Sequence, residues 1–176
     1  MTPSESHSIL ITQSQISTRV RELAEEILAQ HNGQPMTVIL LLKGAILFAA
    51  DLCRHLPSNI QIECLSVSSY HGGTESSGTV TYLDAQLPDV SGRSVLLVDD
   101  ILDTGLTLYS VSQKFKELGA THLSRCVLLS KKKDRLAEVS AEHVGFEIND
   151  EFVIGYGLDY QGRYRNLPYI GVMTLS

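Results

Sequence analysis

Runs of β-prone apolar residues alternate along this chain with segments of helical periodicity, and this alternation constrains the fold more than any other feature. The run at 36–42 is nearly continuous, as is typical of parallel strands covered on both faces, and further apolar runs lie at 95–98 and within 123–130. Between the last two, residues 108–118 repeat apolar side chains at helical spacing. The pattern predicts an α/β fold with a mainly parallel central sheet flanked by helices.

The same reading gives the expected order of elements. We expect a helix over 16–28, a strand at 36–42, a helix over 44–56, a strand at 60–70, a short strand at 79–83, a strand at 93–100, a helix over 108–118, and strands at 123–130 and 151–157. Residues 71–78 are small and polar and predict a loop. No repeat or long linker divides the 176 residues, so we expect one domain over 1–176.

Composition excludes several classes of partner. The net charge of −6 argues against binding to nucleic acid or a membrane surface, because no excess positive field attracts phosphates. Three cysteines, Cys53, Cys64 and Cys126, are widely spaced in apolar sequence and predict free buried thiols. The N-terminus lacks the pattern of a secretory signal, and no apolar run is long enough to span a bilayer. We therefore expect a cytoplasmic protein.

Three carboxylates stand at the end of the strand predicted at 93–100, in the stretch VLLVDDILDTGLTL (95–108). Two unit charges about 5 Å apart repel by about 3 kcal/mol at an effective dielectric constant near 20. Asp99, Asp100 and Asp103 are therefore tolerable together only if hydroxyl groups, cations or water compensate their charge.

The turn that follows these acids has the features of a phosphate site. In open α/β sheets, ligands bind beyond the carboxyl ends of the strands. Residues 104–107 (TGLT) connect strand to helix there, and their backbone N–H groups have no acceptor within the helix. A carboxylate next to them can accept hydrogen bonds from sugar hydroxyls. The stretch thus predicts a site for ribose 5-phosphate.

The acidic cluster also admits other interpretations, most of which need residues that the sequence lacks. A solvated turn with Asp103 as a helix N-cap is the purely structural alternative. A P-loop nucleotidase needs a G-x-x-x-x-G-K-[ST] string, which the sequence lacks. The aspartyl phosphatases need Asp-x-Asp, which DDILDTG does not supply, and GYGLDYQG (155–162) has Tyr160 at the third glycine of a dinucleotide fingerprint.

The stretch at 95–108 resembles the phosphoribosyl pyrophosphate motif of the type I phosphoribosyltransferases. LLKGA (41–45), SSYHGGTESSG (68–78), LLSKKKDR (128–135) and FVIGYGLDYQGRYRNLPYIGV (152–172) narrow the resemblance to the bacterial hypoxanthine-guanine members. The resemblance extends from about residue 10 to the C-terminus. It implies the fold of that family, with a small C-terminal hood beside the central sheet.

The resemblance assigns the phosphoribosyl pyrophosphate site. Asp99 and Asp100 would hold the ribose hydroxyls directly or through Mg²⁺, and Asp99 replaces the glutamate usual in the family. Asp103 would act near purine N7 as the general base. The 5′-phosphate would lie against Thr104, Gly105, Leu106 and Thr107.

The resemblance also assigns a pyrophosphate loop and a lid. Lys43 and Gly44 would belong to the loop, in which the peptide before Lys43 is often cis in this family. Arg165, and with it Arg135, would pair with pyrophosphate oxygens. Ser69 and Tyr70 would belong to a lid over about 68–79 that excludes water from the reacting sugar.

The purine would bind in a region over about 130–172. Lys131 would donate to the 6-oxo group, whereas Lys132 and Lys133 are interpreted as a solvated basic turn. Phe152 would stack on the base and Val153 would offer backbone hydrogen bonds. Asp159 would bind Mg²⁺, which gives a metal set of Asp99, Asp100 and Asp159.

The function implied is that of a Mg²⁺-dependent enzyme of purine salvage. It would transfer the phosphoribosyl group to hypoxanthine, and to guanine, releasing IMP or GMP and pyrophosphate. The alternatives are a xanthine- or guanine-preferring phosphoribosyltransferase and a regulator that senses phosphoribosyl pyrophosphate. The resemblance implies a homodimer or homotetramer, with no nucleic-acid or membrane partner.

Overall fold

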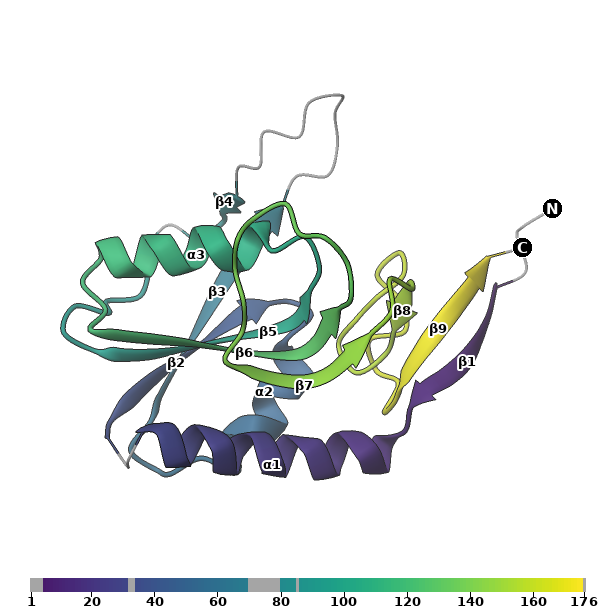
Figure 1. Cartoon of the computed structure of the whole chain (residues 1–176), viewed down its shortest axis with the longest axis horizontal. Helices are drawn as coiled ribbons and strands as arrows, with labels where there is room; N and C mark the ends of the chain where they lie inside the picture. Colours follow the sequence, from purple (N-terminus) through teal and green to yellow (C-terminus); the bar gives the residue numbers. More distant parts are fainter. Residues whose placement is uncertain (1–4, 32–33, 70–79, 85, 176) are drawn as a thin grey trace.

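The central sheet has six strands in the order β4-β3-β2-β5-β6-β7 (Figure 1). The computed structural model describes residues 5–31, 34–69, 80–84 and 86–175. The neighbours pair in parallel except β3 and β4, which pair antiparallel. The strands are β2 (Met36–Leu42), β3 (Gln61–Ser69), β4 (Val80–Tyr82), β5 (Ser94–Leu102), β6 (His122–Lys131) and β7 (His143–Ile148). The predicted parallel α/β sheet is confirmed.

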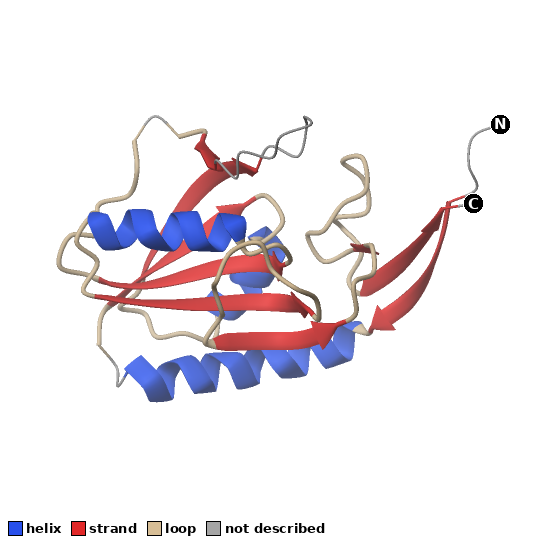
Figure 2. Cartoon of the chain, turned by 45° about the horizontal axis from the view of Figure 1, so that its top comes forward, coloured by secondary structure: helices blue, strands red, loops and turns tan. Residues whose placement is uncertain are grey.

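Helices cover both faces of this sheet and divide the core in two. One face packs against α1 (Gln13–His31) and α2 (Ile46–Cys53), and the other against α3 (Leu106–Glu117) (Figures 1 and 2). Val38 and Leu96 belong to the apolar cluster under α1 and α2, whereas Ile39 and Leu97 belong to the cluster under α3. Successive strand residues point to opposite faces, so a strand buried on both sides is apolar at every position.

A second, smaller sheet joins the two ends of the chain. Its order is β1-β9-β8, with β1 (Glu5–Ile11), β8 (Val153–Ile154) and β9 (Ile170–Leu175) paired antiparallel. It extends from one end of the central sheet (Figure 1). The loops between β8 and β9 return to the carboxyl ends of β2 and β5, where Gly157 meets the backbone oxygen of Gly44. This region corresponds to the predicted hood.

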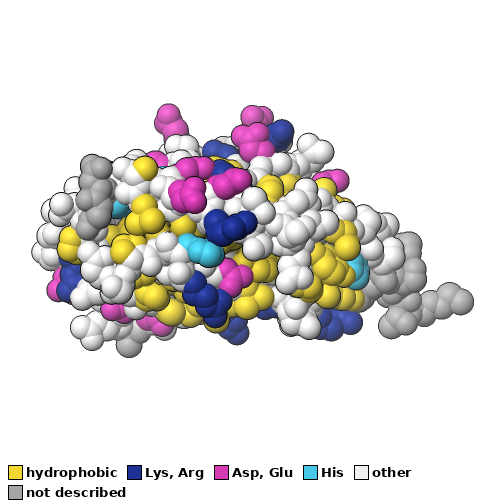
Figure 3. All heavy atoms as spheres, turned by 90° about the horizontal axis from the view of Figure 1, so that it is seen from below, with side chains coloured by type: hydrophobic (Ala, Val, Ile, Leu, Met, Phe, Trp, Pro, Cys, Tyr) yellow, Lys and Arg dark blue, Asp and Glu magenta, His cyan; other side chains and the backbone are white. Residues whose placement is uncertain are grey.

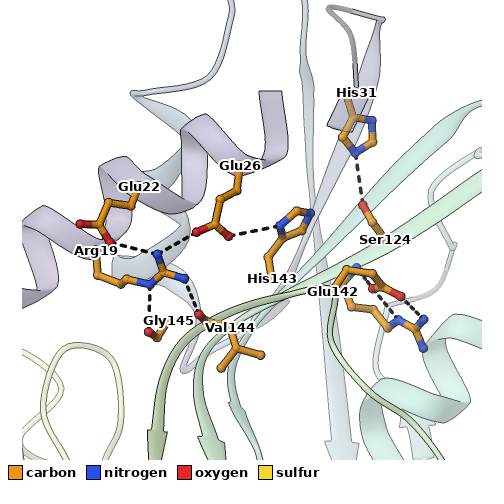
Figure 4. Close-up of polar contacts among 10 residues, drawn as sticks. Arg19, Glu22, Glu26, His31, Ser124, Glu142, His143, Val144 and Gly145 are labelled. Carbon is orange, nitrogen blue, oxygen red and sulfur yellow. Dashed lines mark hydrogen bonds and ion pairs between the residues drawn. The ribbon is translucent and has the colours of Figure 1, made fainter. Parts of the chain in front are cut away.

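Helix α1 is fixed to the edge strand β7 by an arginine. Arg19 donates from Nε to the Gly145 carbonyl (3.0 Å) and from Nη2 to the Val144 carbonyl (2.9 Å), and it also pairs with Glu22 and Glu26 (Figure 4). At its start, Thr12 and Gln15 exchange hydrogen bonds in a capping box. Edge strands carry unpaired backbone groups, and here Arg19 of α1 donates to two adjacent carbonyls of the edge strand β7.

The expected elements differ from the observed ones at several places. The predicted strand at 151–157 is wrong in extent, because only Val153–Ile154 is a strand. The second helix is shorter than the predicted 44–56, and β1, β7 and β9 were not predicted. These strands contain polar and glycine residues and lie at sheet edges or in the small sheet, where one-sided burial leaves a weak sequence pattern.

Two further predictions concern exposure. Cys126 is buried and Cys53 half-buried, but Cys64 is exposed, so the prediction of three buried thiols is wrong for Cys64. It lies on β3, whose Ile62 is also exposed. Within the described ranges, no helix has both the length and the apolar composition needed to cross a bilayer.

Candidate active site

A cavity of about 300 Å³ opens at the carboxyl ends of β2 and β5. Ten residues predicted from the sequence line it, namely Lys43, Gly44, Asp99, Asp100, Asp103, Thr104, Gly105, Thr107, Asp159 and Arg165. The other lining residues are apolar and were not predicted: Leu41, Leu42, Val67, Ile101, Leu102 and Leu108. They lie at the ends of β2, β3 and β5 and in the first turn of α3. The predicted ends of these strands could therefore have pointed to them.

Asp99 and Asp100 are adjacent near the end of β5, just beyond the last residue of β5 that pairs with β2 and while the strand is still paired with β6. Oδ1 of Asp99 accepts a hydrogen bond from the Asp100 backbone N–H (3.0 Å), and Oδ1 of Asp100 accepts one from the Ile101 N–H (2.8 Å). Burial raises the pKa of Asp99 well above its usual value, and repulsion from Asp100 adds to this. Burial also raises the pKa of Asp100, against an opposing effect of Arg165. The pair needs a cation or hydroxyl donors for both groups to ionise at neutral pH.

The loop after β2 lies directly against this pair. Gly44 approaches Asp100 so closely that a Cβ at position 44 would overlap the carboxylate. The peptide between Leu42 and Lys43 is cis, which is the form that the resemblance of LLKGA to a pyrophosphate loop implied. Glycine is thus required at position 44 by the close approach of a neighbouring side chain.

The turn at 104–107 leads from β5 into α3. Gly105 has φ of +83°, and a Cβ there would lie 2.7 Å from Cγ1 of Val139, so both backbone conformation and packing favour glycine. The Leu106 N–H points to Thr104 Oγ1 at 3.5 Å, and Leu106 begins the helix without lining the cavity. The first N–H groups of α3 therefore lie beside the cavity with the positive end of the helix dipole.

The C-terminal region brings Asp159 and Arg165 to the cavity. The Arg165 guanidinium donates to the Gly157 carbonyl (2.5 Å) and pairs with Oδ1 of Asp159 (2.7 Å). Oδ2 of Asp159 accepts from the Gly162 N–H (2.7 Å). These contacts fix an arginine at the cavity wall opposite the acidic pair, within electrostatic reach of Asp100.

Asp103 lies between the cavity and a cluster of lysines. Lys131 at the end of β6 pairs with Oδ2 of Asp103 (3.3 Å), and Lys133 pairs with Oδ1 (2.6 Å). Asp150, in the loop after β7, contacts both lysines. Lys133 is exposed in a bend, as expected of a solvated basic turn, but its ion pairs with Asp103 and Asp150 were not predicted. Asp150 was not predicted at all, because its place beside β6 depends on β7.

The remaining predicted residues lie next to the cavity or elsewhere. Phe152 is 51% exposed and packs edge-on against Tyr160, with ring centroids 5.8 Å apart, and Val153 is buried in β8. Arg135 donates to the Val139 carbonyl and to Ser130 Oγ, both 2.9 Å. Its guanidinium is thus engaged within the loop after β6, contrary to the pyrophosphate role. Ser69 ends β3, its side chain is outside the described residues, and so are Tyr70 and the lid at 70–79.

The residues at the cavity have the chemistry that a hard divalent cation requires. Mg²⁺ prefers oxygen ligands and is commonly held by one or two carboxylates together with substrate phosphates. Asp99 and Asp100 supply such a pair, and burial, which raises the pKa of both carboxyl groups, makes a compensating cation favourable there. Among the residues that the structure describes, no three acidic, histidine or cysteine side chains form a preassembled metal site. The arrangement fits an ion shared with a bound phosphate compound.

Comparisons with known proteins agree with this geometry. The family model "Phosphoribosyl transferase domain" matches residues 9–161. The hypoxanthine-guanine phosphoribosyltransferase of Streptococcus pneumoniae is 41% identical over 165 residues (94% of this chain, 92% of the relative), and that of Staphylococcus aureus is 39% identical over the same coverage.

Solved structures are equally similar. The crystal structure of a hypoxanthine-guanine phosphoribosyltransferase from Bacillus anthracis has a TM-score of 0.89 at 38% identity and covers 97% of this chain and 99% of that one. A Trypanosoma cruzi hypoxanthine phosphoribosyltransferase has a TM-score of 0.88 at 38% identity, with 94% of both chains covered. The fold predicted from the sequence motifs is confirmed, and the chain belongs to the phosphoribosyl transferase family.

Proposed function

We propose that this protein transfers the 5-phosphoribosyl group from phosphoribosyl pyrophosphate to hypoxanthine or guanine, forming IMP or GMP and pyrophosphate. One observation carries the proposal. A single cavity combines the acidic pair Asp99–Asp100, the phosphate-binding turn at 104–107 and the arginine Arg165. A sugar diol, a 5′-phosphate and a pyrophosphate each find the complementary group there.

The sugar and its phosphates are held by charge and hydrogen-bond complementarity. Asp99 and Asp100 accept hydrogen bonds from the ribose hydroxyls, and the N–H groups at the start of α3 donate to the 5′-phosphate. Lys43 and Arg165 face the departing pyrophosphate from two walls of the cavity. Positive groups placed where negative charge develops stabilise the transition state.

The base is held on the other side of Asp103. Lys131 donates to the 6-oxo group, Phe152 stacks on the ring, and the Val153 backbone hydrogen-bonds its edge. Asp103 receives the proton from N7 as the new glycosidic bond forms. An ammonium donor at this position discriminates against adenine, whose exocyclic amine is also a donor.

Mg²⁺ is part of the proposal. Asp99 and Asp100 would hold it together with substrate oxygens, with Asp159 in reach of the same cavity. When bound, the ion supplies positive charge that neutralises the pyrophosphate and the acidic pair.

We also infer a cytoplasmic homodimer or homotetramer with no nucleic-acid or membrane partner. The face of the molecule in Figure 3 carries side chains of both charge signs, interspersed with apolar ones.

The test is product formation from each purine base. Purified protein is incubated with phosphoribosyl pyrophosphate and hypoxanthine, guanine, xanthine or adenine, with Mg²⁺ or with EDTA, and the nucleotides are quantified by chromatography. We expect IMP and GMP only with Mg²⁺, and no AMP. A preference for xanthine would favour the alternative, a xanthine-preferring phosphoribosyltransferase. If hypoxanthine, guanine and xanthine all gave no nucleotide, the proposal would be refuted.

A further inference from the structure

Four charged side chains form a closed ring of ion pairs beside the cavity. We call Asp103, Lys131, Asp150 and Lys133 the ion-pair ring. In it, Lys131 Nζ lies 3.3 Å from Asp103 and 2.9 Å from Asp150. Lys133 Nζ lies 2.6 Å from Asp103 and 3.2 Å from both oxygens of Asp150. Charges alternate around the ring, so its net charge is zero.

The members come from the carboxyl ends of three adjacent strands. Asp103 follows β5, the two lysines end and follow β6, and Asp150 follows β7. Exposure rises across the ring, from 11% for the Lys131 side chain and 28% for Lys133 to 38% for Asp103 and 51% for Asp150. The hydrogen bonds to Asp103 and Asp150 raise the pKa of Lys133, and both lysines lower the pKa of Asp150. The ring therefore favours the charged forms of Lys133 and Asp150.

The ring conflicts with the role that Asp103 has in the proposed reaction. A carboxylate that receives the N7 proton must turn at least one oxygen toward the purine, yet an ammonium group lies against each oxygen of Asp103. Lys131 likewise must reach the 6-oxo group. The base therefore competes with the two ammonium groups for the Asp103 carboxylate, and it binds most tightly when the ring opens at Asp103. After opening, Lys133 still has both oxygens of Asp150, and Lys131 still has one.

We propose that Asp150 is a positioning residue of the purine site, which holds the ammonium groups of Lys131 and Lys133 so that Asp103 can be released to the base. This inference rests on the proposed function. Without the Asp150 carboxylate, Asp103 alone compensates two ammonium groups, and the purine competes with both of them. The loss falls on binding of the base, because Asp150 does not line the cavity that takes the sugar phosphates.

The test is a steady-state comparison of Asp150→Asn with wild type, varying each substrate separately. We expect KM for hypoxanthine to rise by about two- to fivefold, which is the range for partly exposed ion pairs. KM for phosphoribosyl pyrophosphate should stay within about twofold. Asp150→Glu should recover part of the loss, because it restores the charge. Glu147→Gln is the matched control, since Glu147 pairs with the exposed Lys132 outside the ring (3.5 Å).

A second variant separates positioning from structural support. Lys133→Met removes the competing ammonium group, so on its own it should lower KM for hypoxanthine by about twofold. Combined with Asp150→Asn it should restore most of the lost affinity for the base, which a destabilised loop would not allow. Additive losses in the double variant, or equal changes in both KM values, would overturn the inference. Wild-type protein that forms no nucleotide would refute the proposed function instead.

Discussion

Gly44 and Asp100 are in direct contact: the Asp100 carboxylate occupies the position that a Cβ at residue 44 would take. The two residues are 56 positions apart in a 176-residue chain, and parallel pairing of β2 with β5 brings them together. The loop proposed for pyrophosphate and the acids proposed for the ribose are thus in direct contact.

The first prediction concerns this contact. In Gly44→Ala the methyl group displaces the Asp100 carboxylate, which is the movable end of a side chain. We expect kcat/KM for phosphoribosyl pyrophosphate to fall by at least about tenfold, while the free energy of unfolding changes by less than about 1 kcal/mol. Kinetics and urea unfolding measure the two effects.

A second glycine provides the control for this prediction. Gly92 has φ of +70° and open space around its Cα, and it precedes β5 at the opposite end of the strand from the cavity. Gly92→Ala should therefore destabilise the fold by about 1 kcal/mol and leave kinetics unaltered. Similar kinetic losses in both variants would contradict the assignment.

Asp103→Asn should lower turnover far more than substrate affinity. The amide cannot take the N7 proton, so we expect kcat to fall by about 10²- to 10⁴-fold, with KM values within about threefold. Asp89→Asn is the control, because Asp89 accepts a hydrogen bond from the Ser91 N–H and does not line the cavity. An unchanged kcat in Asp103→Asn would end the assignment of the general base.

Asp99→Asn should stabilise the protein and inactivate it. Burial and the neighbouring Asp100 raise the pKa of Asp99, which means that its ionised form is unfavourable in the fold. We expect the free energy of unfolding at pH 7.5 to rise by about 1–2 kcal/mol without Mg²⁺. Added Mg²⁺ should raise the wild-type Tm more than that of the variant. A less stable Asp99→Asn variant would contradict the account of this pair.

Arg19→Met should destabilise the edge of the sheet. It leaves the carbonyls of Val144 and Gly145 without their guanidinium donor, and we expect a loss of about 1–3 kcal/mol in urea unfolding. In the control Glu22→Gln only an exposed ion pair is lost, which costs less than about 1 kcal/mol. Equal midpoints for Arg19→Met and wild type would show that α1 does not support β7 in this way.

The buried histidines predict how stability depends on pH. His31 lies between Ser94 and Ser124, where burial lowers its pKa, and His122 and His143 add to this effect. Burial also lowers the pKa of His143. The negative charges of Glu26 and Glu142 raise this pKa, whereas the positive charge of Arg19 lowers it further (Figure 4).

The protein should become less stable as the pH falls, because of the way its histidines bind protons. Below the ordinary histidine pKa of about 6.5, the unfolded chain binds protons that the folded chain does not yet bind, so stability falls as the pH drops toward the lowered pKa values. Urea unfolding between pH 7.5 and 5.5 should show this fall, and His31→Gln should make it shallower. His55 is exposed, so His55→Gln should leave the slope as in wild type.

Local chemistry made most of the site predictable. Asp99, Asp100 and the turn at 104–107 are contiguous, so their neighbourhood follows from one strand and the helix after it. Lys43 and Gly44 were placed with them by the motif resemblance, which the position of LLKGA between a predicted strand and a predicted helix supports. The motif resemblance then supplied Asp159 and Arg165, which line the same cavity.

The amino-acid sequence by itself determined the parallel sheet, its covering helices and the phosphate turn, because buried strands and helix starts leave strong local patterns. Only the tertiary structure decided that Lys133 contacts both Asp103 and Asp150, and that the Arg135 guanidinium donates to Val139 and Ser130. Those contacts depend on β7, an edge strand with weak patterning, and on side chains that meet across three strand ends. Contacts between segments distant in sequence are set by packing of the whole fold, and local sequence patterns do not predict them.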